Sequence, residues 1–155
     1  MEFHLVQVNV AIARYEYDDP RFAGFVDNLD RIYALAESTP GFVWRHVSVD
    51  GDPEAKAAFG DDRLIYNLSI WESREALHEF VYRSDHADIL RQRADWFEPM
   101  DGPAFALWWE PAGRKPSFVE TRHRLECLRV NGPTQEAFTF RHHFPAPDAT
   151  ERASA

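Results

Sequence analysis

Five polar or aromatic side chains alternate with apolar residues in two strand-like runs of the sequence. Gln7 and Asn9 lie in the first run, and Asn67, Ser69 and Trp71 lie in the second. Every other position of both runs is Val, Leu, Ile or Tyr, as expected of a strand that packs one face on a core. Uncharged amides and a hydroxyl beside an indole are typical of a half-dry cavity, because buried polar groups persist where they find partners.

Asn9 and Asn67 have the chemistry to hold a substrate oxygen. Their amide groups can donate hydrogen bonds to a developing oxyanion, and we predict this catalytic role for both. The alternative is a cross-strand amide pair that fills the interior of the protein. Gln7 and Ser69 are expected to belong to the same polar network and to line the substrate pocket with Trp71.

His86 is the candidate general base. A histidine that titrates near neutrality can deprotonate a phenol or an enol. The spacing of His86, Leu90, Arg93 and Phe97 predicts one shared helix face, which would turn His86 and Arg93 toward the polar strands. The alternative is a helix-capping role, because His86 follows Ser84 and Asp85.

Arg45 and several tryptophans complete the predicted substrate contacts. Arg45 can neutralise an acidic substrate, although an ordinary ion pair with an acidic side chain is the alternative. Trp108 and Trp109 are adjacent on a predicted strand, so their indoles must point to opposite faces. We expect Trp96 or Trp109 to shape the pocket, with ordinary core packing as the alternative for each.

Other common site chemistries find little support in the sequence. The adjacent His142 and His143 would face opposite ways on a strand, and the histidines lack metal-ligand spacing. Neither a glycine-rich phosphate loop nor a G-x-S-x-G motif occurs. We therefore expect no metal site and no nucleotide cofactor.

Composition limits the partners of the protein. The chain has 155 residues, 45% of them hydrophobic, and a formal net charge of −9, which disfavours nucleic acid and anionic membrane surfaces. The single Cys127 excludes an internal disulfide. Because no apolar run approaches about 20 residues, no transmembrane span is expected, and we predict a cytoplasmic protein.

Hydrophobic periodicity and turn residues predict five strands and three helices. The expected strands cover residues 3–14, 42–49, 64–71, 104–109 and 137–144. The expected helices cover residues 20–37, 73–98 and 117–131, with a further helical turn at 54–59.

This order predicts an α+β fold with a ferredoxin-like βαββαβ core and a C-terminal αβ extension. We expect one domain over residues 1–144 and a disordered tail over 145–155. The two main helices would cover one sheet face. The polar side chains would then lie on the other face, which would be closed by self-association.

Several segments along the chain resemble an uncharacterised bacterial family, the domain of unknown function numbered 3291. They are Gln7-Val8-Asn9, residues 40–45, 67–73, 80–86 and 93–97, Leu107-Trp108-Trp109 with residues 111–113, and residues 137–140. That family is similar to the dimeric α/β-barrel superfamily, which includes antibiotic-biosynthesis monooxygenases and haem-degrading oxygenases. The resemblance implies a homodimer whose two sheets close into a barrel and a pocket for a small hydrophobic ligand in each subunit.

The resemblance also implies which activities fit the residues present. The haem degraders of the superfamily use an Asn, a Trp and a His; Asn9 matches the first, whereas Phe80 and Arg91 stand near the other two positions. The cofactor-independent, quinone-forming monooxygenases need only polar groups and aromatics around a phenolic substrate that itself reduces dioxygen. We therefore predict a monooxygenase-like enzyme that acts on a flat, hydrophobic, oxygenated small molecule.

Three alternatives stay open at this point. The first is a haem-binding protein with His86 as the axial ligand. The second is a dimer that binds a small ligand without catalysis. The third is a structural dimer whose interior is filled by its own side chains.

Overall fold

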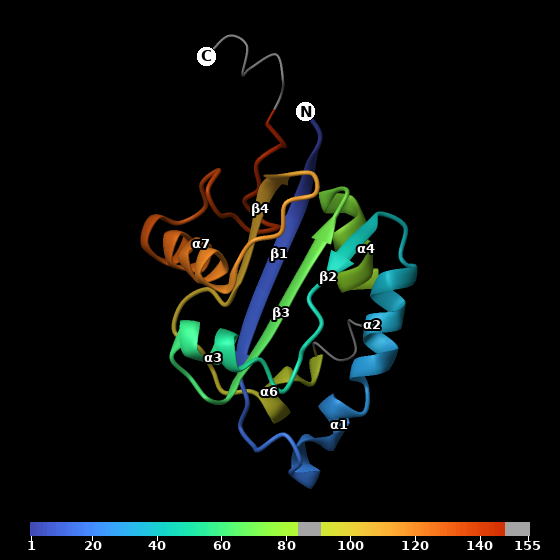
Figure 1. Ribbon diagram of the computed structural model, residues 1–155, viewed down its shortest axis with the longest axis vertical. Helices are drawn as coiled ribbons and strands as arrows, with labels where there is room; N and C mark the ends of the chain where they lie inside the picture. Colours follow the sequence, from blue (N-terminus) through green and yellow to red (C-terminus); the bar gives the residue numbers. More distant parts are fainter. Residues whose placement is uncertain (84–90, 148–155) are drawn as a thin grey trace.

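Four antiparallel strands form the single sheet of this computed structural model, which describes residues 1–83 and 91–147. The strands are arranged in the order β2-β3-β1-β4, which is the order of a ferredoxin-like sheet, as predicted. Figure 1 shows the long central pair β1 and β3 between the shorter outer strands. The strands are β1 (Phe3–Ile12), β2 (Phe42–Arg45), β3 (Leu64–Trp71) and β4 (Phe105–Pro111).

The helices are shorter and more broken than periodicity alone predicts. They are the 3₁₀ helix η1 (Pro20–Phe22), α1 (Ala23–Val26), α2 (Leu29–Ser38), α3 (Pro53–Phe59), α4 (Arg74–Arg83), α6 (Arg93–Trp96) and α7 (Phe118–Asn131). The cap predicted at Asp19 is confirmed, because its carboxylate accepts a hydrogen bond from Arg21 N at 2.8 Å. The predicted helix over 20–37 is nevertheless divided into three pieces.

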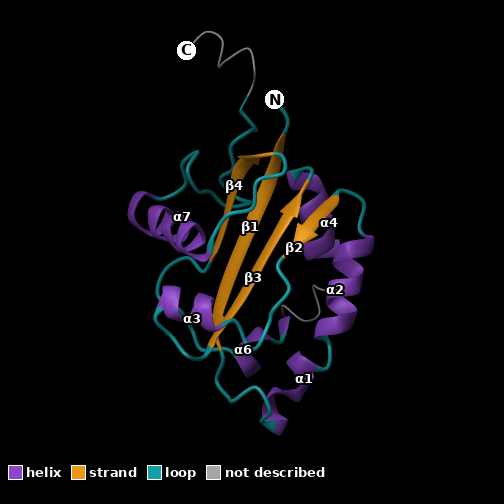
Figure 2. Ribbon diagram, viewed as in Figure 1, coloured by secondary structure: helices purple, strands orange, loops and turns teal. Residues whose placement is uncertain are grey.

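The sheet face that carries the polar row is covered by α2 and α4, so the prediction that the main helices cover the other face and leave this one to self-association was wrong. Leu5, Trp71 and Leu107 from this face pack in one buried cluster with residues of α2 and α4, among them Ile32 and Leu77. Figure 2 shows these two helices on one side of the sheet. The alternation of a strand separates its two faces but does not state which face a helix will cover.

The opposite sheet face is covered by α3 and α7. Its strands present Val6, Val8, Tyr66, Leu68 and Trp108, which pack with residues of α3 and α7 in the largest buried cluster. Ser117 caps α7 by accepting a hydrogen bond from Glu120 N at 3.1 Å, as its spacing predicted. Both faces of the sheet are therefore covered by helices of the same chain.

The C-terminal extension contains its predicted helix but not the strand expected over 137–144. Leu107 and Phe138 exchange two backbone hydrogen bonds of 2.9 and 2.8 Å beside β4. A turn then ends the pairing, since Thr139 N donates to His142 O at 3.2 Å and His142 N donates to Thr139 Oγ1 at 3.1 Å. The disordered tail was predicted over residues 145–155, of which 145–147 are described and 148–155 lie outside the described residues.

No helix among the described residues is long and apolar enough to cross a membrane. The strand predicted over 42–49 ends at Arg45, although His46 N still donates to Leu68 O of β3 at 2.9 Å. The helical turn predicted at 54–59 is the helix α3.

Candidate functional site

Strand register brings the polar residues of β1 and β3 together on one face. Asn9 lies directly opposite Asn67, Gln7 opposite Ser69, and Leu5 opposite Trp71. Directly opposed residues in an antiparallel sheet point to the same side with Cβ atoms about 5 Å apart. The juxtaposition that alternation predicted is therefore present, beneath α2 and α4.

Gln7, Ser69 and Trp71 form a continuous hydrogen-bonded chain. The indole Nε1 of Trp71 donates to Ser69 Oγ at 2.8 Å, and Ser69 Oγ donates to Gln7 Oε1 at 2.8 Å. All three residues are buried, and the Trp71 ring stacks on Phe80 with 5.4 Å between ring centroids. The Ser69 hydroxyl therefore donates to Gln7 and accepts from Trp71, so these three buried side chains are hydrogen-bonded to one another.

Asn9 and Asn67 differ from that trio. Both residues are half-buried, and Asn9 Oδ1 is a buried acceptor with no hydrogen-bond partner among the described residues. An unpartnered buried polar atom costs about 1–3 kcal/mol, so native proteins rarely keep one without a reason. As placed, this oxygen can accept a hydrogen bond from a ligand O–H, whereas the predicted donation to an oxyanion would need the Nδ2 of the same amide.

An aromatic group stands beside this amide pair. Phe105 of β4 lies opposite Asn9 and stacks on Phe140 at 5.4 Å. Phe140 also contacts His78 and Tyr82 of α4 edge-on, at 5.4 and 5.5 Å between centroids. Amide groups and ring faces therefore adjoin one another along the seam between α4 and residues 138–145.

Sequence reasoning missed His78 and Phe140 as members of this site. His78 has no metal-ligand spacing, and Phe140 was placed in a fifth strand that does not form. One signal was present, since His78 and Tyr82 are four residues apart and so share one face of a helix. The position of Phe140 depends on the turn at 139–142, which periodicity does not reveal.

Three predicted substrate contacts have other surroundings. Arg45 pairs with Glu37, its Nε 2.8 Å from Glu37 Oε1, and its guanidinium lies 3.9 Å from the centre of the Tyr33 ring. Trp96 is buried in an aromatic cluster with Phe22, and Arg93 is exposed on α6. The ion pair and core packing that were weighed as alternatives match the positions of Arg45 and Trp96.

The predicted base His86 lies outside the described residues, as does Leu90. The face it was expected to share is described only from Arg93, which is exposed, and Phe97, which is half-buried in the cluster of Trp96. The role of His86 stays a prediction.

The two adjacent tryptophans of β4 point to opposite faces, as predicted. Trp108 is fully buried against α7, and its Nε1 donates to Glu110 Oε1 at 3.0 Å. Trp109 lies on the polar-row face, where its Nε1 donates to Phe144 O at 2.8 Å. Trp109 also lines a surface groove of about 340 Å³, whereas Gln7, Asn9, Asn67, Ser69 and Trp71 do not.

Burial changes the titration of one tyrosine on the far face. Tyr66 is buried under α7, and its hydroxyl lies 3.0 Å from Thr121 Oγ1. Desolvation raises the pKa of Tyr66 to about 12, because the phenolate would lose its hydration. This phenol is therefore neutral and structural at physiological pH.

The sequence matches one protein family over residues 4–154, and that family is described as a domain of unknown function, DUF3291. The chain belongs to this family. No curated protein matches it.

Among solved structures, the DUF3291 chain is similar to the NE2512 protein of Nitrosomonas europaea, a protein of unknown function. The two share 13% identity over 74% of this chain and 96% of that chain, with a TM-score of 0.50, which supports the fold. SnoaB, a cofactor-independent oxygenase from Streptomyces nogalater, is 13% identical over 72% of this chain and 95% of its own, with a TM-score of 0.47. A putative antibiotic biosynthesis monooxygenase from Chloroflexus aurantiacus is 18% identical over 73% and 97%, with a TM-score of 0.43.

The seam of this DUF3291 chain brings polar and aromatic side chains together. Across residues 1–83 and 91–147, no three His, Cys, Asp or Glu side chains are grouped to hold a metal ion. The seam offers an amide acceptor, aromatic rings and the imidazole of His78. Such a set is suited to hold a flat molecule that carries an O–H group.

Proposed function

We propose that this protein binds a flat, oxygenated small molecule over Asn9 and Asn67 and acts on it as a monooxygenase-like enzyme. The observation that carries the proposal is Asn9 Oδ1, a buried acceptor without a described partner. A ligand phenol or enol O–H supplies the missing donor, which removes the free-energy cost of the unsatisfied oxygen.

Aromatic neighbours support a flat ligand. Phe105 and Phe140 stack beside Asn9, and His78 and Tyr82 approach from α4. Offset stacking and edge contacts of this kind favour aromatic ligands by about 0.5–1.5 kcal/mol per pair. Asn9 Oδ1 is itself buried, so a ligand O–H reaches it only if the seam between α4 and residues 138–145 opens locally.

The proposed reaction needs a base, a substrate that is its own reductant, and dioxygen. The base removes the phenol or enol proton, and the resulting anion passes electrons to dioxygen. A ring CH₂ becomes a C=O: one atom of dioxygen enters the product, and the other leaves as water with the two hydrogens. All electrons come from the substrate, so the balance requires no other reductant.

Two histidines are candidates for the base. His86 is the residue that the sequence predicts. His78 is the candidate within the described residues, since its ring adjoins Phe140 next to the amide pair. A homodimer and a haem-binding role also stay predictions.

Anthrone is a suitable probe, because its enol form carries an O–H and oxygenation converts it to anthraquinone and water. We expect the protein to accelerate oxygen uptake by anthrone, and Asn9→Leu to abolish the acceleration. His78→Gln and His86→Gln, tested separately, identify the base by loss of turnover with retained anthrone binding. Retained turnover in Asn9→Leu would contradict the proposal. Binding of anthrone by the wild-type protein without oxygen uptake would support the non-catalytic alternative.

A further inference from the structure

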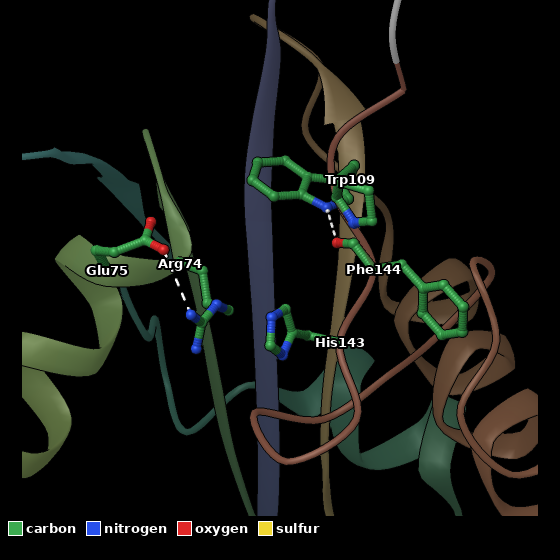
Figure 3. A pocket seen from close by; sticks show the side chains of 6 residues that line it. Arg74, Glu75, Trp109, His143 and Phe144 are labelled. Atoms are coloured by element: carbon green, nitrogen blue, oxygen red, sulfur yellow. Dashed lines mark hydrogen bonds and ion pairs between the residues drawn. The ribbon is translucent and has the colours of Figure 1, made fainter. Parts of the chain in front are cut away.

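The surface groove lined by Trp109 lies on the same seam, above the end of the sheet where Leu5 of β1 pairs with β3 and β4. It has a volume of about 340 Å³ and is lined by Arg74, Glu75, Trp109, His143, Phe144 and Pro145. Figure 3 shows the Arg74 guanidinium and the His143 ring facing one another, with the Trp109 indole above them. The groove therefore combines a guanidinium that is paired with the Glu75 carboxylate, an imidazole and an aromatic wall.

Arg74 supplies the positive charge. Among the described residues, its one ion pair is with Glu75, through a single contact of 3.4 Å between Arg74 Nη2 and Glu75 Oε1. The Glu75 side chain is 74% exposed and the Arg74 side chain 29%, and a solvent-accessible pair of this kind contributes about 0–1 kcal/mol. A planar guanidinium has five N–H donors, so most of them stay available to a ligand.

His143 has a defined tautomer at this position. Its Nδ1 lies 3.2 Å from Phe140 O, and a carbonyl oxygen can only accept. Nδ1 therefore carries a hydrogen, which leaves Nε2 as the ring nitrogen that can meet a ligand. Because residue 143 is exposed, that contact requires no rearrangement of the core.

Trp109 forms a fixed wall rather than a mobile one. Its Nε1 donates to Phe144 O at 2.8 Å, which ties the indole to the C-terminal segment. Leu5 lies opposite both Trp109 and Trp71, so the floor of this region is apolar. An aromatic ring of a ligand can lie against this indole while its charged end meets Arg74.

We propose that this groove binds a planar aromatic carboxylate. A carboxylate matches the forked donors of a guanidinium in two parallel hydrogen bonds, and the indole accounts for an aromatic rather than an aliphatic body. The volume of about 340 Å³ lies at the lower end of small-molecule sites, which favours a ligand with a single ring. On a protein with a net charge of −9, such a ligand also needs a local cation to approach.

This groove is separate from the amide pair. On β4, Trp109 is four residues from Phe105, the residue opposite Asn9, which is about 13 Å along a strand. Leu107 and Phe138, both fully buried, fill the sheet face between the two positions. Binding at one position therefore does not require binding at the other.

Calorimetric titration of the full-length protein with benzoate and with benzamide tests the proposal. The two probes have the same ring, and only benzoate carries a negative charge. Arg74→Gln removes the guanidinium, and Arg122→Gln on α7 is the matched control, because it removes an exposed arginine on the opposite side of the sheet. Circular dichroism melts establish that the variants fold, and if Arg74→Gln does not fold, His143→Gln provides the comparison at an exposed residue.

The expected result is saturable binding of benzoate that is weakened at least about tenfold by Arg74→Gln, since a hydrogen bond to a charged group is worth that much. Arg122→Gln and Asn9→Leu should keep the wild-type Kd, and benzamide should bind at least about tenfold more weakly than benzoate. Absence of saturable benzoate binding, equal Kd values for the two probes, or an equal effect of both arginine variants would overturn the proposal. Because Asn9→Leu tests the other site, failure of one proposal is distinguishable from failure of the other.

Discussion

Asn9 and Ser69 show that similar residues in one row can have opposite roles. The Ser69 hydroxyl is hydrogen-bonded to both Gln7 and Trp71, whereas the buried oxygen of Asn9 has no described partner. Alternation in the sequence predicted that these side chains share a face, because a strand has a period of two. Which of these side chains have hydrogen-bond partners depends on rotamers and cross-strand distances. Neither can be predicted from the alternation of polar and apolar residues.

The unpartnered oxygen of Asn9 predicts an unusual effect on stability. Replacing Asn9 by the similarly shaped, apolar Leu removes a buried unsatisfied acceptor, so the free energy of unfolding should stay equal or rise by about 1–2 kcal/mol. Urea denaturation measures it, with Asn67→Leu as the matched control on the opposite strand. A loss of more than about 1 kcal/mol in Asn9→Leu alone would show that Asn9 stabilises the fold.

Ser69 predicts the opposite outcome. Ser69→Ala removes the partner of two buried groups, Trp71 Nε1 and Gln7 Oε1, each of which costs about 1–3 kcal/mol when unsatisfied. We expect a loss of at least about 2 kcal/mol. In a double-mutant cycle with Trp71→Phe, the losses should be less than additive, because the second change removes a group that the first left unpaired. Strict additivity would show that the hydrogen-bonded chain contributes nothing as a unit.

At the scale of elements, the ferredoxin-like core was predictable and its coverage was not. Strand runs and turn residues indicated β1, β3 and β4 nearly to their ends, and Ser117 indicated the start of α7. The helix predicted over 20–37 is divided into η1, α1 and α2, and hydrophobic periodicity does not reveal these breaks. The face beneath α2 and α4 is set by connection handedness together with strand register, and register is a long-range property.

The close approach of Gly41, just before β2, to Ala76 of α4 predicts that alanine substitutions at two glycines differ in their effect on stability. Both have positive φ, +93° at Gly41 and +90° at Gly113, so an alanine is strained at either position. A Cβ at Gly41 would also lie 2.5 Å from Ala76 Cβ, whereas nothing lies within 4 Å at Gly113. Gly113→Ala should cost about 1–2 kcal/mol, and Gly41→Ala should cost about 1–3 kcal/mol more. Equal melting temperatures for the two variants would contradict the described packing of α4.

The burial of Tyr66 between the sheet and α7 predicts a loss of stability at alkaline pH. Because burial raises the pKa of Tyr66 to about 12 from 10.0, the folded state holds the phenolic proton more tightly than the unfolded state. This contribution is fully present below pH 10 and is lost as pH rises toward 12, by about 2–3 kcal/mol in total. Tyr66→Phe should flatten that part of the pH profile in urea denaturation. An unchanged slope in Tyr66→Phe would mean that another group titrates there.

At the scale of the whole molecule, this chain covers both faces of its sheet by itself. The homodimer expected from the family resemblance was to close a barrel from two sheets, yet α3 and α7 already pack on the face opposite α2 and α4 (Figure 1). A homodimer therefore has to use surfaces other than an open sheet face. A chain that ends at residue 116 loses Leu125 and Leu128 from one sheet face and Phe138 from the other, so we expect it to expose apolar surface and to self-associate. Light scattering that finds the shortened and full-length chains in the same monodisperse state would contradict this.

The central claim, that Asn9 Oδ1 accepts a hydrogen bond from a ligand O–H, is tested most directly by a pair of probes. We propose to measure the Kd of 1-naphthol and of 1-methoxynaphthalene, which cannot donate, for the wild-type protein and for Asn9→Leu. The wild-type protein should prefer 1-naphthol by about tenfold, and Asn9→Leu should bind both probes equally, because the discrimination resides in one hydrogen bond at a buried atom. Equal affinities for the wild-type protein, or a preference that survives in Asn9→Leu, would contradict the claim.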